Sequence, residues 1–216
     1  MTDIHSSISV IIPVYNRSTL INRAIKSVME QTMLPDEIIV IDDGSTDGTD
    51  NIVKNRYPEV ILLKQKNRGV SCARNNGINN AKGTWLALLD SDDEWLPEKL
   101  EKQLLGLRND SNKKICHTDE IWIRNGVRVN PMNKHRKYGG NIYKYCLPLC
   151  VISPSSIIIH KEIFKNVGLF DEDLPVCEDY DLWLRICSRY PVLYLQEKLI
   201  KKYGGHDDQL SRQYWG

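Results

Sequence analysis

Short apolar runs alternate with amphipathic segments along the first ninety residues. The apolar runs are residues 8–14, 37–41, 60–64 and 83–89. The first of them is rich in β-branched residues and apolar on both faces, as a buried parallel strand is. Apolar residues at helical spacing between these runs predict helices at about 18–31, 47–57 and 70–80. Ser18 is expected to cap the first helix and Thr46 or Asp47 the second. Strands and helices in this order predict βαβ units and a mostly parallel sheet.

The second half of the chain has a different pattern. A helix at about 97–108 is followed by alternating apolar residues around Asn125 and Gly126, which predicts antiparallel strands. A strand at 155–160, a helix at 179–189 and a strand at 192–195 follow. The basic segment from Lys134 to Gly140 is expected to be a mobile loop.

A length of 216 residues favours one α/β domain. We expect a nucleotide-binding half at about 8–95, a smaller antiparallel half for an acceptor at about 96–205, and a tail at 206–216. Because Tyr214 and Trp215 stand at its end, we expect the tail to continue into a further C-terminal segment.

Charge, hydropathy and cysteine content disfavour a nucleic-acid-binding, membrane-spanning or disulfide-rich protein. The formal net charge is only +1, so no overall field would attract nucleic acid, and an anionic ligand needs a local site. No apolar run approaches the ~20 residues of a membrane span, and the first seven residues are short and polar. Six scattered cysteines without a CxxC pair predict reduced thiols. These features predict a cytoplasmic protein, which could still act at the membrane surface on a lipid-linked acceptor.

Polar residues stand directly after three of the predicted strands. They are Tyr15-Asn16-Arg17, Asp42-Asp43 and Asp90-Ser-Asp-Asp93. In open α/β sheets, ligands bind beyond the carboxyl ends of the strands, so we expect these clusters to meet in one crevice.

The acidic cluster at 90–93 has the clearest chemistry. Three carboxylates on one turn repel each other, and Mg²⁺ or Mn²⁺ would relieve that repulsion and bridge to a diphosphate. A solvated loop that caps the following helix is the structural alternative.

Five further residues have both a functional and a structural interpretation. Asp43 could accept hydrogen bonds from a nucleoside or belong to an ordinary Asp-Gly turn. Arg74 could bind phosphate or be a solvated surface residue. Glu178 and Asp179 could act on an acceptor hydroxyl or simply favour the start of a helix. His206 could complete a metal site or be an exposed tail histidine.

Taken together, these segments resemble glycosyltransferase family 2, whose members have the GT-A fold. The matching stretches are Val10 to Arg17, Ile41 to Asp47, Asn67 to Asn75, Leu88 to Asp93, Phe170 to Glu172 and Glu178 to Trp183. They cover nearly the whole chain in order, from about residue 8 to 190.

The resemblance implies a Rossmann-like sheet and an inverting, metal-dependent transfer from a nucleotide-sugar, with UDP favoured. It also implies roles for individual residues. The implied nucleotide-sugar contacts are Pro13, Tyr15, Asn16, Asp43, Arg74, Asp90 and Asp93. Asp92 is implied as the principal metal ligand and His206 as a further one. Asp179 is implied as the catalytic base, with Glu178 orienting it or binding the acceptor. The implied acceptor is a saccharide or lipid-linked saccharide, and a peripheral membrane location and a homodimer are further expectations.

Other nucleotide-binding classes lack their motifs here. The first strand is followed by neither GxGxxG nor a glycine-rich basic loop, and no GxxxxGK[ST] occurs, which disfavours dehydrogenases, nucleotidyltransferases and P-loop NTPases. A non-catalytic sugar-nucleotide-binding module remains the alternative from another class.

Overall fold

The computed structural model describes residues 6–205. Its strands are β1 (Ile8–Val14), β2 (Glu37–Asp42), β3 (Ile61–Lys64), β4 (Trp85–Leu88), β5 (Glu94–Trp95), β6 (Ile115–Arg124), β7 (Val127–Val129), β8 (Ile158–His160) and β9 (Leu193–Gly204). Its α-helices are α1 (Ile21–Met29), α2 (Thr49–Arg56), α3 (Val70–Asn80), α4 (Lys99–Asn109), α5 (Tyr143–Cys146), α6 (Glu162–Val167) and α7 (Glu178–Cys187). Short 3-10 turns occur at Asn133–His135 and Pro154–Ser156.

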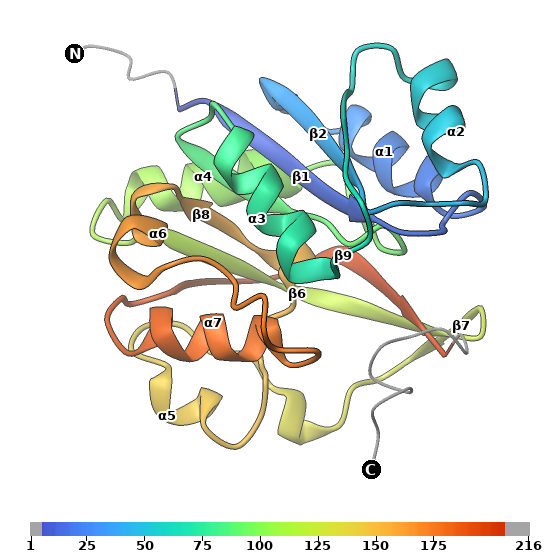
Figure 1. The fold of residues 1–216 in the computed structure, drawn as a ribbon. Helices are drawn as coiled ribbons and strands as arrows, with labels where there is room; N and C mark the ends of the chain where they lie inside the picture. Colours follow the sequence, from blue (N-terminus) through green and yellow to red (C-terminus); the bar gives the residue numbers. More distant parts are fainter. Residues whose placement is uncertain (1–5, 206–216) are drawn as a thin grey trace.

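All of these strands join one sheet (Figure 1). Within the described range the order is β3-β2-β1-β4-β8-β6-β9-β5, and β7 pairs with β6 at the side. The strands from β3 to β4 are parallel, whereas β8 is antiparallel to both of its neighbours. The fold is therefore a mixed α/β sheet with a parallel first half, as the sequence predicts.

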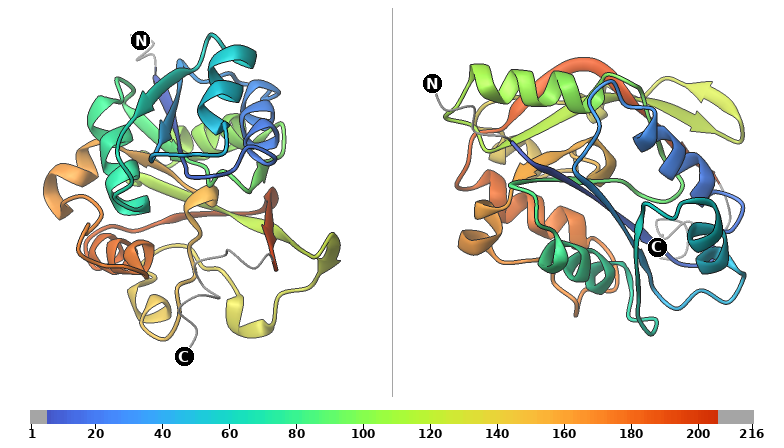
Figure 2. Two further views of the ribbon diagram at one scale, coloured as in Figure 1. Left: turned by 45° about the vertical axis from the view of Figure 1, so that its right-hand side comes forward. Right: turned by 90° about the horizontal axis from the view of Figure 1, so that it is seen from above.

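Helices cover both faces of the sheet, because the strands are apolar on both faces. Along β1, Ile11 belongs to the core on the side of α3 and α7, while Val10 and Ile12 belong to the core on the side of α1 and α4. Gly77 lets α3 approach the sheet closely, since a Cβ there would lie 2.5 Å from Ile11 Cγ2. Figure 2 shows these layers from two further sides.

Several elements differ from the sequence-based expectation. Helix α1 begins at Ile21, and Ser18 does not cap it; the Ser18 N–H instead donates to Asp47. The short helices α5 and α6 were not expected, and β9 is twelve residues long rather than four. The basic segment after Lys134 is held in place, because Lys137 is buried and paired with Glu120.

The structure also bears on the expected state of the cysteines and on the expected lack of membrane-spanning helices. All six cysteines lie in the described range and are free thiols. No helix between residues 6 and 205 has the length and apolar character needed to cross a bilayer.

Candidate active site

The loops that follow β1 and β2 are joined to each other at the carboxyl end of the sheet. The Asn16 N–H donates to Ser45 Oγ over 2.9 Å, and the Asn16 side chain accepts from the Thr46 N–H over 2.8 Å. Asn16 has φ 50°, a left-handed conformation that asparagine tolerates better than most residues. Tyr15, beside it, is 46% exposed and open to a ligand. The sequence-predicted residues Tyr15 and Asn16 therefore stand at the rim of the expected crevice, whereas Pro13 is buried within β1.

Asp43 organises the loop that leads into α3. Its carboxylate is 3% exposed and accepts hydrogen bonds from the Gln65 side chain (2.8 Å) and from the main-chain N–H groups of Arg68 (3.0 Å) and Gly69 (2.9 Å). Its contact with a nucleoside stays a prediction. Next to it, one oxygen of buried Asp42 accepts from the Ser45 N–H, and the other has no hydrogen-bond partner in the described part of the chain.

Arg74 connects two acidic segments that are far apart in the sequence. Its guanidinium is 4% exposed and donates to Asp90 and to Glu178, each over 2.7 Å. Burial alone would lower the pKa of Arg74, but the two carboxylates raise it above its ordinary value. Since Asp90 lies in the acidic loop and Glu178 begins α7, this ion-pair bridge brings both sequence-predicted acidic clusters to one place. Direct contact between Arg74 and a donor nucleotide stays a prediction.

Asp93 is buried at the end of the acidic loop, and its predicted contact with the donor sugar stays a prediction. It is 2% exposed, and its carboxylate accepts from Ser155 Oγ (2.6 Å) and from the Tyr203 N–H (2.9 Å). Burial raises its pKa well above the ordinary value, and the neighbouring charges of Asp92 and Asp90 raise it further. Asp93 thus ties the acidic loop to β9, because both of its oxygens are occupied inside the protein.

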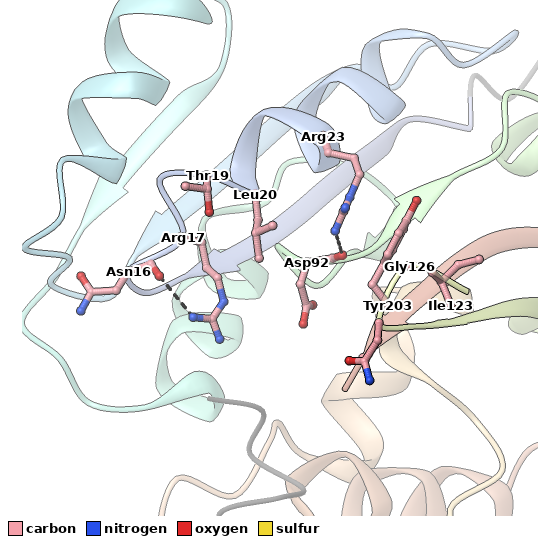
Figure 3. Close-up of a pocket in the computed structure, with 11 residues that line it drawn as sticks. Asn16, Arg17, Thr19, Leu20, Arg23, Asp92, Ile123, Gly126 and Tyr203 are labelled. Atoms are coloured by element: carbon pink, nitrogen blue, oxygen red, sulfur yellow. Dashed lines mark hydrogen bonds between the residues drawn. The ribbon is translucent and has the colours of Figure 1, made fainter. Parts of the chain in front are cut away.

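Asp92 has a more open position beside a cavity of about 350 Å³. The β1 loop and α1 contribute Arg17 and Arg23 to the lining, and the far wall is made by Tyr203 and residues around the β6–β7 turn. Arg23 donates to the Asp92 main-chain oxygen and lies over the Tyr203 ring, 3.6 Å from its centroid. In Figure 3 the Asp92 carboxylate points away from this contact. Arg23 and Tyr203 therefore hold the main chain of the acidic loop while the Asp92 side chain faces the cavity region.

Asp179 is a half-buried carboxylate in the first turn of α7. Burial raises its pKa, the adjacent Glu178 charge raises it further, and Arg74 and Lys202 act in the opposite direction. The residue before the pair, Cys177, has φ 62°, a conformation that costs free energy for a residue other than glycine. The raised pKa makes Asp179 a better proton acceptor than an ordinary surface aspartate.

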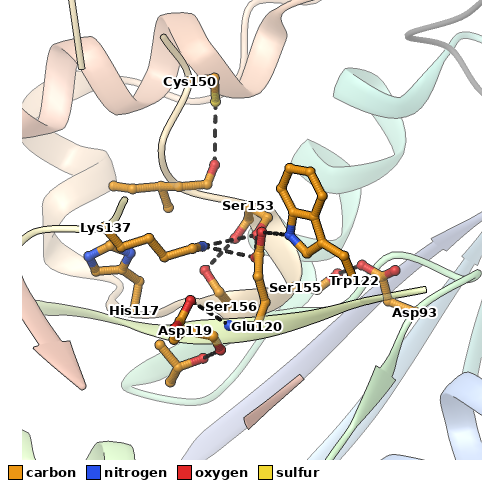
Figure 4. Close-up of polar contacts among 12 residues, drawn as sticks. Asp93, His117, Asp119, Glu120, Trp122, Lys137, Cys150, Ser153, Ser155 and Ser156 are labelled. Carbon is orange, nitrogen blue, oxygen red and sulfur yellow. Dashed lines mark hydrogen bonds and ion pairs between the residues drawn. The ribbon is translucent and has the colours of Figure 1, made fainter. Parts of the chain in front are cut away.

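A buried charge network beside this helix was not found from the sequence. Glu120 on β6 accepts from Lys137 Nζ (2.9 Å), from Trp122 Nε1 (2.6 Å) and from Ser153 (Figure 4). Burial would raise the pKa of Glu120, but Lys137 and Lys202 hold it below the ordinary value.

Lys202, half-buried on β9, links this network to the site electrostatically. Burial would lower its pKa, but Glu120, Asp93 and Asp179 together hold it above the ordinary value. The sequence shows only two adjacent acids, Asp119 and Glu120, between apolar residues, and a basic segment after Lys134. Neither pattern predicts which residue of the other becomes its partner.

The residues that could hold a divalent cation are few. In the part of the chain that the structure describes, no three His, Cys, Asp or Glu side chains gather as a metal site. His206, the further predicted ligand, lies outside the described residues. Two carboxylates of the acidic loop come into question: Asp92 lies beside the cavity, and Asp90 is half-buried with one oxygen paired to Arg74. Mg²⁺ in proteins is often held by one or two carboxylates together with substrate phosphates, so these residues fit such an ion.

Comparisons with known proteins show the family and the fold of this chain. The model of the family described as glycosyl transferase family 2 matches residues 9–168. A Bacillus subtilis glycosyltransferase, TuaG, provisionally assigned to teichuronic acid biosynthesis, is 39% identical over 100% of this chain and 85% of its own length. The Escherichia coli UDP-Glc:α-D-GlcNAc-diphosphoundecaprenol β-1,3-glucosyltransferase WfaP is 32% identical over 84% of this chain and 70% of its own.

Other relatives are longer than this chain. An uncharacterized glycosyltransferase of Rickettsia typhi is 34% identical over 94% of this chain and 65% of its own length. The chain spans from about a third to two thirds of such Rickettsia proteins. Among solved structures, S. aureus TarS in complex with UDP-GlcNAc has a TM-score of 0.79 at 22% identity, covering 96% of this chain and 61% of that one. That likeness establishes the shared GT-A fold.

Proposed function

The chain belongs to glycosyltransferase family 2, and from that premise we propose that it transfers a sugar from a nucleotide-sugar, with UDP as the nucleotide, to a hydroxyl group of a saccharide acceptor. The transfer inverts the anomeric carbon. The observation that carries this proposal is the Arg74 bridge, which ties the loop of Asp92 to the helix end that carries Asp179.

Two related proteins support the choice of substrates. WfaP uses UDP-Glc and an acceptor linked to diphosphoundecaprenol. TarS has been solved with UDP and with UDP-GlcNAc. We therefore assign a UDP-sugar as donor and a lipid-linked saccharide as acceptor. The cytoplasmic location and the homodimer expected from the sequence stay predictions.

Asp179 is the proposed general base. Its carboxylate takes the proton of the acceptor hydroxyl while the acceptor oxygen forms a bond to the anomeric carbon. The bond between that carbon and the phosphate oxygen breaks at the same time, and the nucleoside diphosphate leaves with the bonding electrons. Attack from the face opposite the diphosphate gives inversion. Glu178 is held by Arg74 beside this base and fixes the start of α7.

Asp92 is the proposed main ligand for Mg²⁺ or Mn²⁺, with Asp90 as a second carboxylate. Such an ion would supply positive charge against the leaving diphosphate. The protein's own contribution is to hold Asp92 towards the cavity, through the Arg23 contact to its main chain and the Tyr203 contact to Asp93.

The deciding experiment measures UDP release from UDP-sugars in the presence of Mn²⁺ or Mg²⁺ and a saccharide acceptor. We expect Asp179→Asn to lower turnover about 10²- to 10⁴-fold, the usual contribution of a general base, with donor binding nearly unchanged. Asp181→Asn is the matched control, because Asp181 lies on the same helix and pairs with Arg185 over 2.6 Å.

Two results would refute the proposal. Turnover of Asp179→Asn equal to that of Asp181→Asn would remove Asp179 as the base. Tight binding of UDP-sugars without any transfer, across donors and acceptors, would instead support a non-catalytic sugar-nucleotide-binding module.

A further inference from the structure

The positive charges of this chain are distributed unevenly in a way that the net charge conceals. Residues 121–161 contain seven lysines and arginines and no aspartate or glutamate. All 28 acidic residues and the other 22 cations lie outside that segment. A nearly neutral protein therefore has one segment of 41 residues that contains seven positive charges and no acid of its own.

The middle of this segment lies on the surface. It runs from the β7 end through the turn at Asn133–His135 to α5, along the lower edge of the molecule in Figure 1 and again in the left view of Figure 2. Its exposed side chains include the basic Lys134, Arg136 and Lys144 and the apolar Met132 (61% exposed), Tyr143 (41%) and Leu147 (54%). We call these six residues the basic face.

Contacts behind the basic face hold it in one shape. Tyr138 and Tyr145 stack with ring centroids 3.9 Å apart, and the Lys144 Nζ lies 4.9 Å from the Tyr145 centroid. The Tyr180 hydroxyl on α7 donates to the Leu147 main-chain oxygen over 2.7 Å. Because these contacts pre-order the backbone, binding through this surface would lose little conformational entropy.

Three acids on the elements next to the face, Glu178, Asp181 and Glu120, are paired with cations of their own. On α7, which packs on α5, Glu178 is bound to Arg74 and Asp181 to Arg185. On β6, Glu120 is bound to Lys137 inside the protein. The exposed cations of the basic face therefore act outwards rather than on these carboxylates.

We propose that the basic face binds the surface of an anionic phospholipid bilayer. Lysine and arginine near such a surface are attracted by its negative potential, and exposed apolar side chains among them gain by entering the headgroup region. The exposed apolar chains of Met132 and Leu147 favour a bilayer over a nucleic acid, because they gain by entering the headgroup region and offer no ring on which a base could stack.

Membrane binding through this face would also help the enzyme to reach a lipid-linked acceptor, an inference that rests on the proposed function. The same segment that carries the face reaches the site, because Cys150 Sγ lies 3.8 Å from Asp179 Oδ2. A protein lying on the bilayer through this segment would keep the proposed base close to an acceptor whose lipid remains in the membrane.

Vesicle sedimentation tests the proposal with the protein alone, without donor, metal or acceptor. We expect binding to phosphatidylcholine vesicles that contain about 30 mol% phosphatidylglycerol, and none to vesicles of phosphatidylcholine alone. Replacing Lys134, Arg136 and Lys144 by glutamine should weaken binding about a hundredfold, at about fivefold for each cation. Replacing Met132 and Leu147 by serine should weaken it about tenfold.

The control carries the same change of charge elsewhere. Lys54, Arg56 and Lys82 are exposed on the nucleotide-binding half, and their triple glutamine variant should bind within about threefold of the wild type. Equal losses in the two triple variants, equal binding to neutral vesicles, or an unchanged Met132/Leu147 variant would each overturn the proposal; the last would indicate a soluble polyanion instead. Transfer to a water-soluble acceptor should be unchanged in the basic-face triple variant, so failure of membrane binding and failure of the proposed transfer can be told apart.

Discussion

Replacing Arg74 with methionine should destabilise the protein more than any other single arginine change near the site. The substitution keeps an apolar chain of similar length against Phe170, whose ring centroid lies 5.1 Å from the guanidinium carbon. It removes the charge that Asp90 and Glu178 share. Those two carboxylates would then face each other without a cation in a protected position.

The size of the effect follows from the exposure of the two carboxylates. Breaking a buried ion pair by removing one partner costs about 3–5 kcal/mol. The Glu178 side chain is 9% exposed and cannot be rehydrated easily, but Asp90 is 27% exposed and can recover part of its hydration. We therefore expect a loss of about 3 kcal/mol in the free energy of unfolding, near the lower end of that range. For a domain of this size the loss corresponds to a fall in Tm of about 6–12 °C.

Urea unfolding followed by circular dichroism at pH 7 measures this loss, and Arg68→Met is the control. Arg68 also pairs with a glutamate, Glu172, over 2.9 Å, but its side chain is 65% exposed. An exposed pair of this kind contributes at most about 1 kcal/mol. The double variant Arg74→Met/Glu178→Gln should regain about half of the loss, because the stranded buried charge is gone. A cost below about 1 kcal/mol for Arg74→Met, equal to that of the control, would refute the view that Arg74 is the buried link between the two acidic segments.

Three further predictions concern charge and pH. Asp92→Asn should raise the Mn²⁺ concentration for half-maximal transfer at least about tenfold, as loss of a direct ligand would; an unchanged metal titration would exclude Asp92 as the main ligand. Because burial and then Glu178 raise the pKa of Asp179, the acidic limb of the rate profile should lie above the ordinary aspartate value of about 3.9, and a limb at or below that value would contradict the assignment. Burial lowers the pKa of Lys99 to about 7. The unfolded chain therefore holds this proton between about pH 7 and 10 while the folded protein does not, so stability should rise with pH across that window. Lys99→Met should abolish that rise, as measured by unfolding at several pH values, and a rise that persists would mean that Lys99 stays charged in the fold.

The fold of the first half could be predicted from the sequence because its signals are local. Runs such as Ile8–Val14 are apolar on both faces, and only a strand covered by helices on both sides buries such a run. The rule that ligands bind at the carboxyl ends of parallel strands then brought Tyr15, Asp43 and Asp90 to one edge of the sheet. Cap positions were less predictable: Ser18 has the chemistry of a helix cap, but its N–H is bound to Asp47 in another loop.

The second half depended on contacts that have no local signature. Strand β9 continues through Lys198, Lys201 and Lys202 because β6 and β5 pair with it on both sides. In the sequence its apolar pattern is interrupted by the three polar residues 196–198. Sequence reasoning therefore ended the strand at Leu195, and it left Lys137 in a mobile loop although the folded chain buries it against Glu120.

The sequence by itself determined which residue types were present for the chemistry and which strands would deliver most of them, because hydrophobic periodicity and strand ends are properties of neighbouring residues. Only the tertiary structure decided how these residues are used. Arg74 and Glu178 are 104 positions apart and became partners through the packing of α3 and α7 on the same face of the sheet. The tertiary packing also encloses Asp93 and leaves Asp92 beside the cavity. The sequence cannot distinguish these two adjacent acids, because the burial of each depends on what the rest of the chain places around it.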